Sequence, residues 1–197
     1  MNTENVILMR ESRESLRGKW GTAILTFVIF SLLTAAWGSV EHRGSLLTLI
    51  IGGPLSLGAA IFSLNISRGK EARLEQLFDG FKYFTTALVT YLLMLLYVLL
   101  WTLLLIIPGI IAALGYSMTY YILADDPLLK PQDALKKSKT MMNGHKTKLF
   151  YLCLRFFLLA LLCILTLGIG FFWLIPYVHV TMAKFYDDIN GSSFLSV

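Results

Sequence analysis

Long apolar runs alternate with short polar segments along almost the whole chain. Six runs cover residues 20–40, 45–66, 84–107, 108–124, 149–165 and 168–185. A helix needs roughly 20 apolar residues to cross a bilayer, because the hydrocarbon core is about 30 Å thick and each residue adds about 1.5 Å. The pattern therefore predicts an all-α, polytopic membrane protein with about six transmembrane helices. The fourth and fifth runs are short enough for tilted or partial insertion.

A short charged segment stands before every second apolar run. The three segments are "VILMRESRESLRGKW", "KEARLEQLFDGFKYF" and "DALKKSKTMMNGHKTKLF", and each contains a glycine shortly before the chain turns apolar again. These glycines, Gly18, Gly80 and Gly144, are 62 and then 64 residues apart. Such an even period indicates internal repeats. We expect a single membrane domain over residues 1–197, made of three repeated hairpins at about 6–67, 70–127 and 131–190.

The charged segments have the spacing of short amphipathic helices. In the second segment Leu74, Leu77, Phe78 and Phe81 follow i, i+3, i+4, i+7 order, which places them on one face of an α-helix. We expect the helix of the third segment to start at Pro131, because proline is tolerated in the first turn of a helix. We expect these helices to lie on the cytoplasmic membrane surface or against the ends of the spans, each ended by its glycine.

Small residues recur at four-residue spacing in two of the apolar runs. One set is Gly52, Ser56 and Ala60, and the other is Gly109, Ala113 and Ser117. Small faces of this kind let helix backbones approach closely inside a membrane. They indicate helix packing within one chain, with dimerisation or a substrate path as the alternatives.

Aspartates stand at corresponding points of the second and third hairpins, at Asp125 and Asp187. Repeats arranged around a common axis would bring these helix ends together. An acid at a helix C-terminus opposes the helix dipole at a cost of roughly 0.3–1 kcal/mol. We therefore expect a partner for each, either a lysine such as Lys146 or Lys82 in a structural role, or a cation or protein partner in a functional one.

The positions of the charged residues predict how the protein is oriented in the membrane. The chain is 56% hydrophobic and 15% charged with a mean hydropathy of +0.69, outside the soluble range of about 45–50% apolar and 25% charged. Lysine and arginine gather before the first run, between the second and third, and between the fourth and fifth, whereas the opposite side has only Arg43. Basic residues near span ends stay cytoplasmic. We expect an inner-membrane protein with both termini in the cytoplasm.

The same basic segments suggest partners. Each lysine or arginine near an anionic membrane surface contributes about 1 kcal/mol to the attraction between protein and membrane. We therefore expect contact with anionic lipid. Nucleic acid is not needed to explain the net charge of +5, because the charge follows the positive-inside pattern.

The chain carries no recognisable catalytic constellation. It lacks a paired-histidine zinc motif, a glycine-rich phosphate loop and a nucleophile elbow. We therefore expect no enzymatic activity, metal or cofactor. The alternative of a lipid-modifying enzyme is supported only by the expected location in the membrane. Ionisable groups within the apolar runs are costly and often functional, which singles out Arg155 and His179, with Tyr177 beside it. Snorkelling or a structural hydrogen bond is the alternative for each.

Several stretches resemble a known bacterial integral-membrane family, the domain-of-unknown-function family 975. They are "ILADDP", "ALKKSKTMMNGHKTKLF" and "LTLGIGFFWLIPYVHVTMAKFYDDI", all between Tyr116 and Ile189. Arg155 departs from the pattern of that family. The resemblance implies a six-span inner-membrane protein and no particular activity.

Two functional hypotheses follow from these observations. The first is a non-enzymatic scaffold, stress or accessory factor that meets a protein partner through its cytoplasmic surface helices. The second is a small transporter or channel, because repeats and helices interrupted by glycine and proline are typical of transporters.

Overall fold

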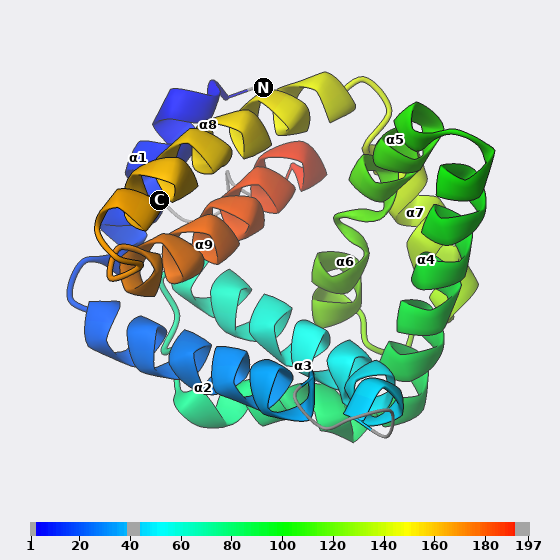
Figure 1. The fold of residues 1–197 in the computed structure, drawn as a ribbon, viewed down its shortest axis with the longest axis horizontal. Helices are drawn as coiled ribbons and strands as arrows, with labels where there is room; N and C mark the ends of the chain where they lie inside the picture. Colours follow the sequence, from blue (N-terminus) through cyan, green and yellow to red (C-terminus); the bar gives the residue numbers. More distant parts are fainter. Residues whose placement is uncertain (1–2, 39–43, 192–197) are drawn as a thin grey trace.

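The computed structural model describes residues 3–38 and 44–191. All regular structure in these residues is helical, which confirms the predicted all-α class (Figure 1). The helices are α1 (Asn5–Leu16), α2 (Trp20–Gly38), α3 (Gly44–Ser67), η1 (Leu74–Tyr83), α4 (Phe84–Leu104), α5 (Ile106–Tyr116), α6 (Thr119–Asp125), α7 (Pro131–Met141), α8 (Lys146–Leu165) and α9 (Phe171–Asn190). The segment around Arg43, which the charge pattern places outside the cell, lies outside the described residues.

Long helices pack side by side in three pairs: α2 with α3, α4 with α5, and α8 with α9. In Figure 1 the first pair lies along the lower edge, the second along the right side and the third along the upper left. The three pairs run in different directions rather than as one parallel bundle. Helix α3 contacts α9 and α6 as well as its neighbours, so it connects the three pairs.

The core is concentrated on α3 and α9. Two thirds of the apolar window of α3 (67%) is buried, whereas only 11% of the η1–α4 window and 17% of the α8 window is. The exposed side chains of α4 and α8 are mostly Leu, Ile, Phe and Trp. Such broad apolar surfaces need an apolar environment, because soluble proteins rarely expose large contiguous apolar patches.

Fewer helices than expected have the length and composition to cross a membrane. Among the described residues there are four such segments, Ile50–Ser67, Leu74–Leu104, Ile106–Asp125 and Lys146–Leu165, and a fifth if α1 and α2 are joined across their 101° bend. The last predicted span is not among them, because α9 carries Lys184, Asp187 and Asp188 near its C-terminal end. The fourth predicted span is divided between α5 and α6, with the break at Ser117 and Met118.

The charged segments fold as helices, with one difference from expectation. α1 buries Leu8, Ser12 and Leu16, and α7 buries Ala134, Leu135 and Ser138. The second segment is a 3-10 helix, η1, and it packs against the middle of α3.

The 3-10 geometry changes which face of η1 is buried. Three residues per turn align Leu74, Leu77 and Gly80, rather than the set expected from an α-helix. Leu77 is fully buried, but Phe78 and Phe81 are 44% and 36% exposed. Of the expected apolar stripe, Leu77 therefore packs inside the protein, whereas Phe78 faces outward.

Glycines allow α3 and η1 to touch along their backbones. A Cβ atom added at Gly58 would lie 1.8 Å from the carbonyl oxygen of Leu77, and one at Gly80 would lie 2.0 Å from that of Pro54. Any larger residue at either glycine would push the two helices apart. Gly58 is not in the spaced set Gly52, Ser56 and Ala60; within that set, a Cβ at Gly52 would lie 3.3 Å from the Tyr91 ring of α4.

Candidate functional site

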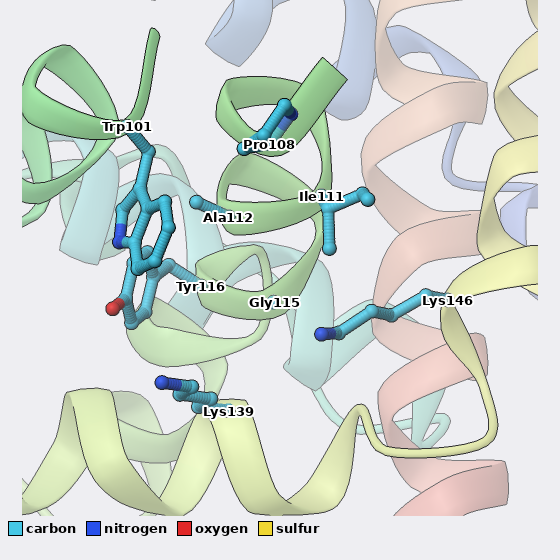
Figure 2. A pocket seen from close by; sticks show the side chains of 8 residues that line it. All are labelled: Trp101, Pro108, Ile111, Ala112, Gly115, Tyr116, Lys139 and Lys146. Atoms are coloured by element: carbon cyan, nitrogen blue, oxygen red, sulfur yellow. The ribbon is translucent and has the colours of Figure 1, made fainter. Parts of the chain in front are cut away.

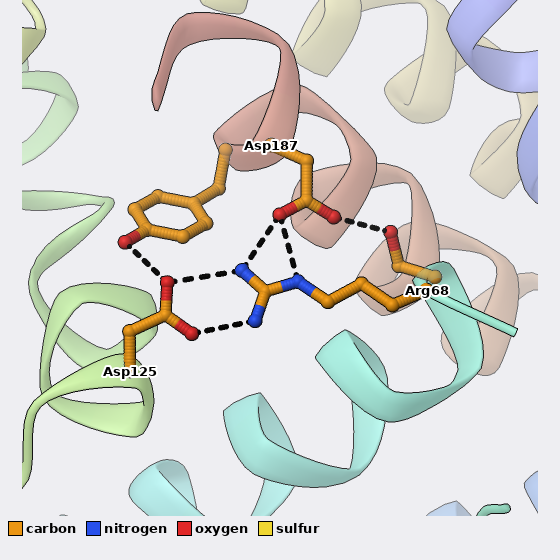
Figure 3. Close-up of polar contacts among 5 residues, drawn as sticks. Arg68, Asp125 and Asp187 are labelled. Atoms are coloured by element: carbon orange, nitrogen blue, oxygen red, sulfur yellow. Dashed lines mark hydrogen bonds and ion pairs between the residues drawn. The ribbon is translucent and has the colours of Figure 1, made fainter. Parts of the chain in front are cut away.

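Three chain segments that are far apart in sequence meet at one ion-pair cluster (Figure 3). Arg68 follows the last residue of α3, Asp125 ends α6, and Asp187 lies near the end of α9. The Arg68 guanidinium donates to Asp125 through Nη1–Oδ1 at 2.6 Å and Nη2–Oδ2 at 2.9 Å. It also donates to Oδ1 of Asp187 from Nε at 3.0 Å and from Nη2 at 2.8 Å. The planar fork of arginine is suited to such bidentate contacts.

Two hydroxyl groups complete this cluster. The Ser67 hydroxyl donates to Oδ2 of Asp187 at 2.8 Å, and the Tyr186 hydroxyl donates to Oδ2 of Asp125 at 2.9 Å. We call Ser67, Arg68, Asp125, Tyr186 and Asp187 the Arg68 cluster. Each of its four carboxylate oxygens accepts at least one hydrogen bond.

The Arg68 cluster is partly shielded from water. The Asp187 side chain is 7% exposed, and those of Arg68 and Asp125 are 26% and 30% exposed. The hydrogen bond to Asp125, opposed by burial and supported by Asp187, raises the pKa of Arg68 above its ordinary value. The guanidinium therefore stays charged, and it is the cation shared by both carboxylates.

A second cluster lies one residue further along α9. Asp188 accepts from Lys148 Nζ at 2.6 Å, from the Thr3 backbone N–H at 3.2 Å and from the Thr3 hydroxyl at 2.5 Å. The Asn5 side chain donates to the backbone carbonyl of Lys148 at 2.9 Å. Burial alone would raise the pKa of Asp188, but the hydrogen bonds from Lys148 and Thr3 hold it below its ordinary value.

The adjacent acids of α9 connect different parts of the molecule. Successive residues of an α-helix point in directions about 100° apart, because there are 3.6 residues per turn. Asp187 consequently faces the end of α3, whereas Asp188 faces α8 and Thr3, two residues before α1. Together they connect α9 to the end of α3, to α8 and to Thr3.

The structure brings together two of the residues singled out from sequence. Asp125 and Asp187 share one partner, which is Arg68 and not Lys146 or Lys82 as expected. Lys82 instead pairs with Asp79 at 2.8 Å. Sequence reasoning missed Arg68 because it counted that residue only among the basic residues that set orientation. The available signal was its position at the end of the first hairpin, where the other two hairpins carry aspartate.

The other three candidates lie elsewhere and have separate contacts. The Tyr177 hydroxyl donates to the Met9 carbonyl at 3.0 Å, and the Arg13 guanidinium lies 5.9 Å from the centroid of the Tyr177 ring. His179 stacks on Phe27, with ring centroids 4.4 Å apart. Arg155 is on the exposed face of α8 and forms no ion pair within the described ranges.

The chemistry of the Arg68 cluster is that of a closed structural contact. Within residues 3–38 and 44–191 no group of three or more histidine, cysteine, aspartate or glutamate side chains is placed to hold a metal ion. The position between the two carboxylates, where a metal ion would bind, is taken by the guanidinium. The geometry stabilises the meeting of three segments.

A family model described as a protein of unknown function, DUF975, matches the chain over residues 1–112 and 103–193. Neither a curated protein nor a solved structure matches it. The two matched ranges together cover nearly the whole sequence and agree with the resemblance carried by the motifs between Tyr116 and Ile189. The chain therefore belongs to the DUF975 family of proteins of unknown function.

Proposed function

We propose that this protein is a non-enzymatic, multi-pass factor of the bacterial inner membrane that binds a protein partner through α1 and α7 at the cytoplasmic face. The observation that carries the proposal is the Arg68 cluster. It engages Arg68, Asp125 and Asp187 with one another, so these charges are not left free for a substrate or an ion. Many of the charged groups that stay accessible are on the short helices or in the connections next to them.

Exposed charges on α1 and α7 supply the recognition groups. Arg10 and Glu14 of α1 form a pair at 3.9 Å, with side chains 74% and 69% exposed. On α7, Lys136 and Lys137 are exposed, while Ser138 donates from its hydroxyl to the Gly115 carbonyl at 2.9 Å. Both helices therefore present charge outward from a fixed position.

The proposal includes the orientation and repeat organisation expected from sequence. Each short helix leads into one helix pair: α1 into α2 and α3, η1 into α4 and α5, and α7 toward α8 and α9. This order supports three repeated hairpins, and the basic residues of the connecting segments support a cytoplasmic position.

A small transporter is the second candidate, and one feature favours it. The break between α5 and α6 interrupts an apolar segment, as the discontinuous helices of transporters do. Against it, Asp125 at the end of α6 is held by Arg68 and by Tyr186. Transport would require this cluster to open.

Site-specific photo-cross-linking in native membranes tests the proposal. A cross-linking residue is placed at Glu14 on α1, at Lys137 on α7, and at Leu99 on the apolar face of α4 as the matched control. We expect one discrete protein adduct from positions 14 and 137 and none from position 99. In an Asp125→Asn background the adduct at position 137 should weaken, because the contact of Arg68 with α6, which packs against α7, is weakened.

The contrary result is equally specific. Adducts formed only at position 99 would place the partner on the membrane-embedded surface and contradict a role for α1 and α7. Absence of adducts at positions 14 and 137, together with solute or ion flux in proteoliposomes that Asp187→Asn alters, would favour the transporter.

A further inference from the structure

A groove lies beside α5 and is lined by residues of α4, α5, α7 and the start of α8 (Figure 2). It has a volume of about 310 Å³, and its wall includes Trp101 of α4 together with Pro108, Ile111 and Tyr116 of α5. An adjoining cavity of about 400 Å³ shares Trp101 and Tyr116 with it. The groove is accessible from the apolar surroundings, because Trp101 and Ile111 are 44% and 46% exposed.

Two lysines bound one end of this groove. Lys139 comes from α7 and Lys146 from the first residue of α8, and in Figure 2 both side chains lie at the end away from Pro108. The Lys146 side chain passes close to Gly115, since a Cβ there would be in ordinary contact with Lys146 Cε, at 3.6 Å. The groove therefore has a cationic end and an apolar end.

The two ammonium groups are not part of the ion pairs formed among the described residues. In the part of the chain that the structure describes, neither Lys139 nor Lys146 has an acidic group within ion-pair distance, unlike Lys82 and Lys148. The C-terminus of α5 faces Lys146, but a helix end is equivalent to only about half an elementary charge. A ligand with a full negative charge is needed to match this end of the groove.

We propose that the groove is a binding site for an anionic phospholipid. Its phosphate contacts Lys139 and Lys146, and one acyl chain lies along Trp101, Ile111 and Pro108. Basic pockets beside membrane helices bind anionic lipid headgroups, and an indole or phenol at such a site spans the boundary between headgroup and chain. The apolar wall favours a lipid over a free phosphate ion, because free phosphate leaves that wall exposed. This inference does not depend on the proposed partner of α1 and α7.

Native mass spectrometry of the full-length, delipidated protein in mild detergent tests the site. Phosphatidylglycerol and phosphatidylcholine with identical acyl chains are titrated separately, and glycerol phosphate serves as the headgroup alone. We expect the wild type to bind phosphatidylglycerol most tightly. The Lys139→Gln/Lys146→Gln variant should lose about 30-fold in affinity for it, which corresponds to about 1 kcal/mol for each lysine.

Two further variants separate a defined site from general attraction. Lys70→Gln/Lys130→Gln removes the same charge at exposed positions away from the groove and should keep the wild-type affinity. Ala112→Phe keeps both lysines but fills the apolar end, and it should also weaken phosphatidylglycerol binding. If the lysine variant does not fold, Ala112→Phe provides the test alone.

Three outcomes would overturn the inference. Equal losses in the two lysine variants would mean unspecific charge attraction. Equal binding of the two lipids by the wild type would mean that the headgroup is not recognised. Glycerol phosphate that binds as tightly as the lipid, with no effect of Ala112→Phe, would identify a site for a small phosphate compound instead.

Discussion

A single guanidinium group holds three helix ends at the scale of individual residues. Arg68 has five N–H donors in a plane. Its three nitrogens all donate hydrogen bonds to the carboxylates of Asp125 and Asp187. Each carboxylate also accepts from one hydroxyl, Asp187 from Ser67 and Asp125 from Tyr186, but the two are not equivalent, because Asp187 is the more buried. Removing charge at Asp187 should therefore cost more than removing it at Asp125.

The first prediction compares these two aspartates. Asp187→Asn should lower the stability of the detergent-solubilised protein by about 1.5–3 kcal/mol, the usual contribution of hydrogen bonds to charged groups. Asp125→Asn should cost less, and Asp79→Asn, which breaks a more exposed pair with Lys82, should cost under about 1 kcal/mol. Thermal unfolding followed by circular dichroism measures all three. The reverse order would mean that the Arg68 cluster does not stabilise the fold.

The second prediction concerns acid. Because the folded-state pKa of Asp188 lies below its ordinary value of 3.8, its contribution to stability is present above about pH 3.8 and is lost as the pH falls through the folded pKa. Unfolding temperatures at pH 6 and pH 3 should therefore differ less in Asp188→Asn than in the wild type. An identical pH dependence would show that Asp188 does not carry this effect.

Helix type decides the packing at the scale of elements. The amphipathic pattern predicts helical structure in all three charged segments, and each is helical. The pattern does not distinguish a 3-10 helix from an α-helix over ten residues, because two or three turns fit both periods. The backbone contacts of η1 with α3 at Gly58 and Gly80 are tertiary, so no local pattern reveals them.

A third prediction follows from the buried row of η1. Leu77→Asp should expose the bond after Arg73 to trypsin, because a charge at the fully buried Leu77 separates η1 from α3. Phe78→Asp should leave cleavage near the wild-type rate, since its side chain is 44% exposed. Limited proteolysis of solubilised protein gives both rates. Equal protection in both variants would mean that Leu77 does not hold η1 in place.

Three differently directed helix pairs joined at two ionic clusters form the whole molecule. Hydropathy predicts long apolar helices, and the pairing of successive helices follows from their short connections. Hydropathy does not predict the break within the fourth apolar run. It also does not predict which residue pairs with Asp125 and Asp187. The first depends on local geometry at Ser117 and Met118, and the second joins residues 57 and 119 positions apart.

The fourth prediction concerns orientation in the membrane. After Cys153 and Cys163 are changed to serine, single cysteines are introduced at Arg43, Arg73 and Lys137. A membrane-impermeant maleimide added to intact cells should label position 43 alone, because basic segments stay cytoplasmic. Labelling of all three positions after permeabilisation is the control. Strong labelling of position 137 in intact cells would reverse the proposed topology.

The separation of 119 residues between Arg68 and Asp187 has a consequence for biosynthesis. A ribosome adds about 5–20 residues per second, so Arg68 leaves the ribosome roughly 6 to 24 seconds before its second carboxylate partner. Throughout that interval its charge is less than fully compensated, and it can act as a signal that keeps the first connecting segment on the side of synthesis. Once α9 arrives, the same charge becomes an internal contact. Under the proposed topology, we expect Arg68 to help orient the nascent chain first and to join the helix ends of the finished protein afterwards.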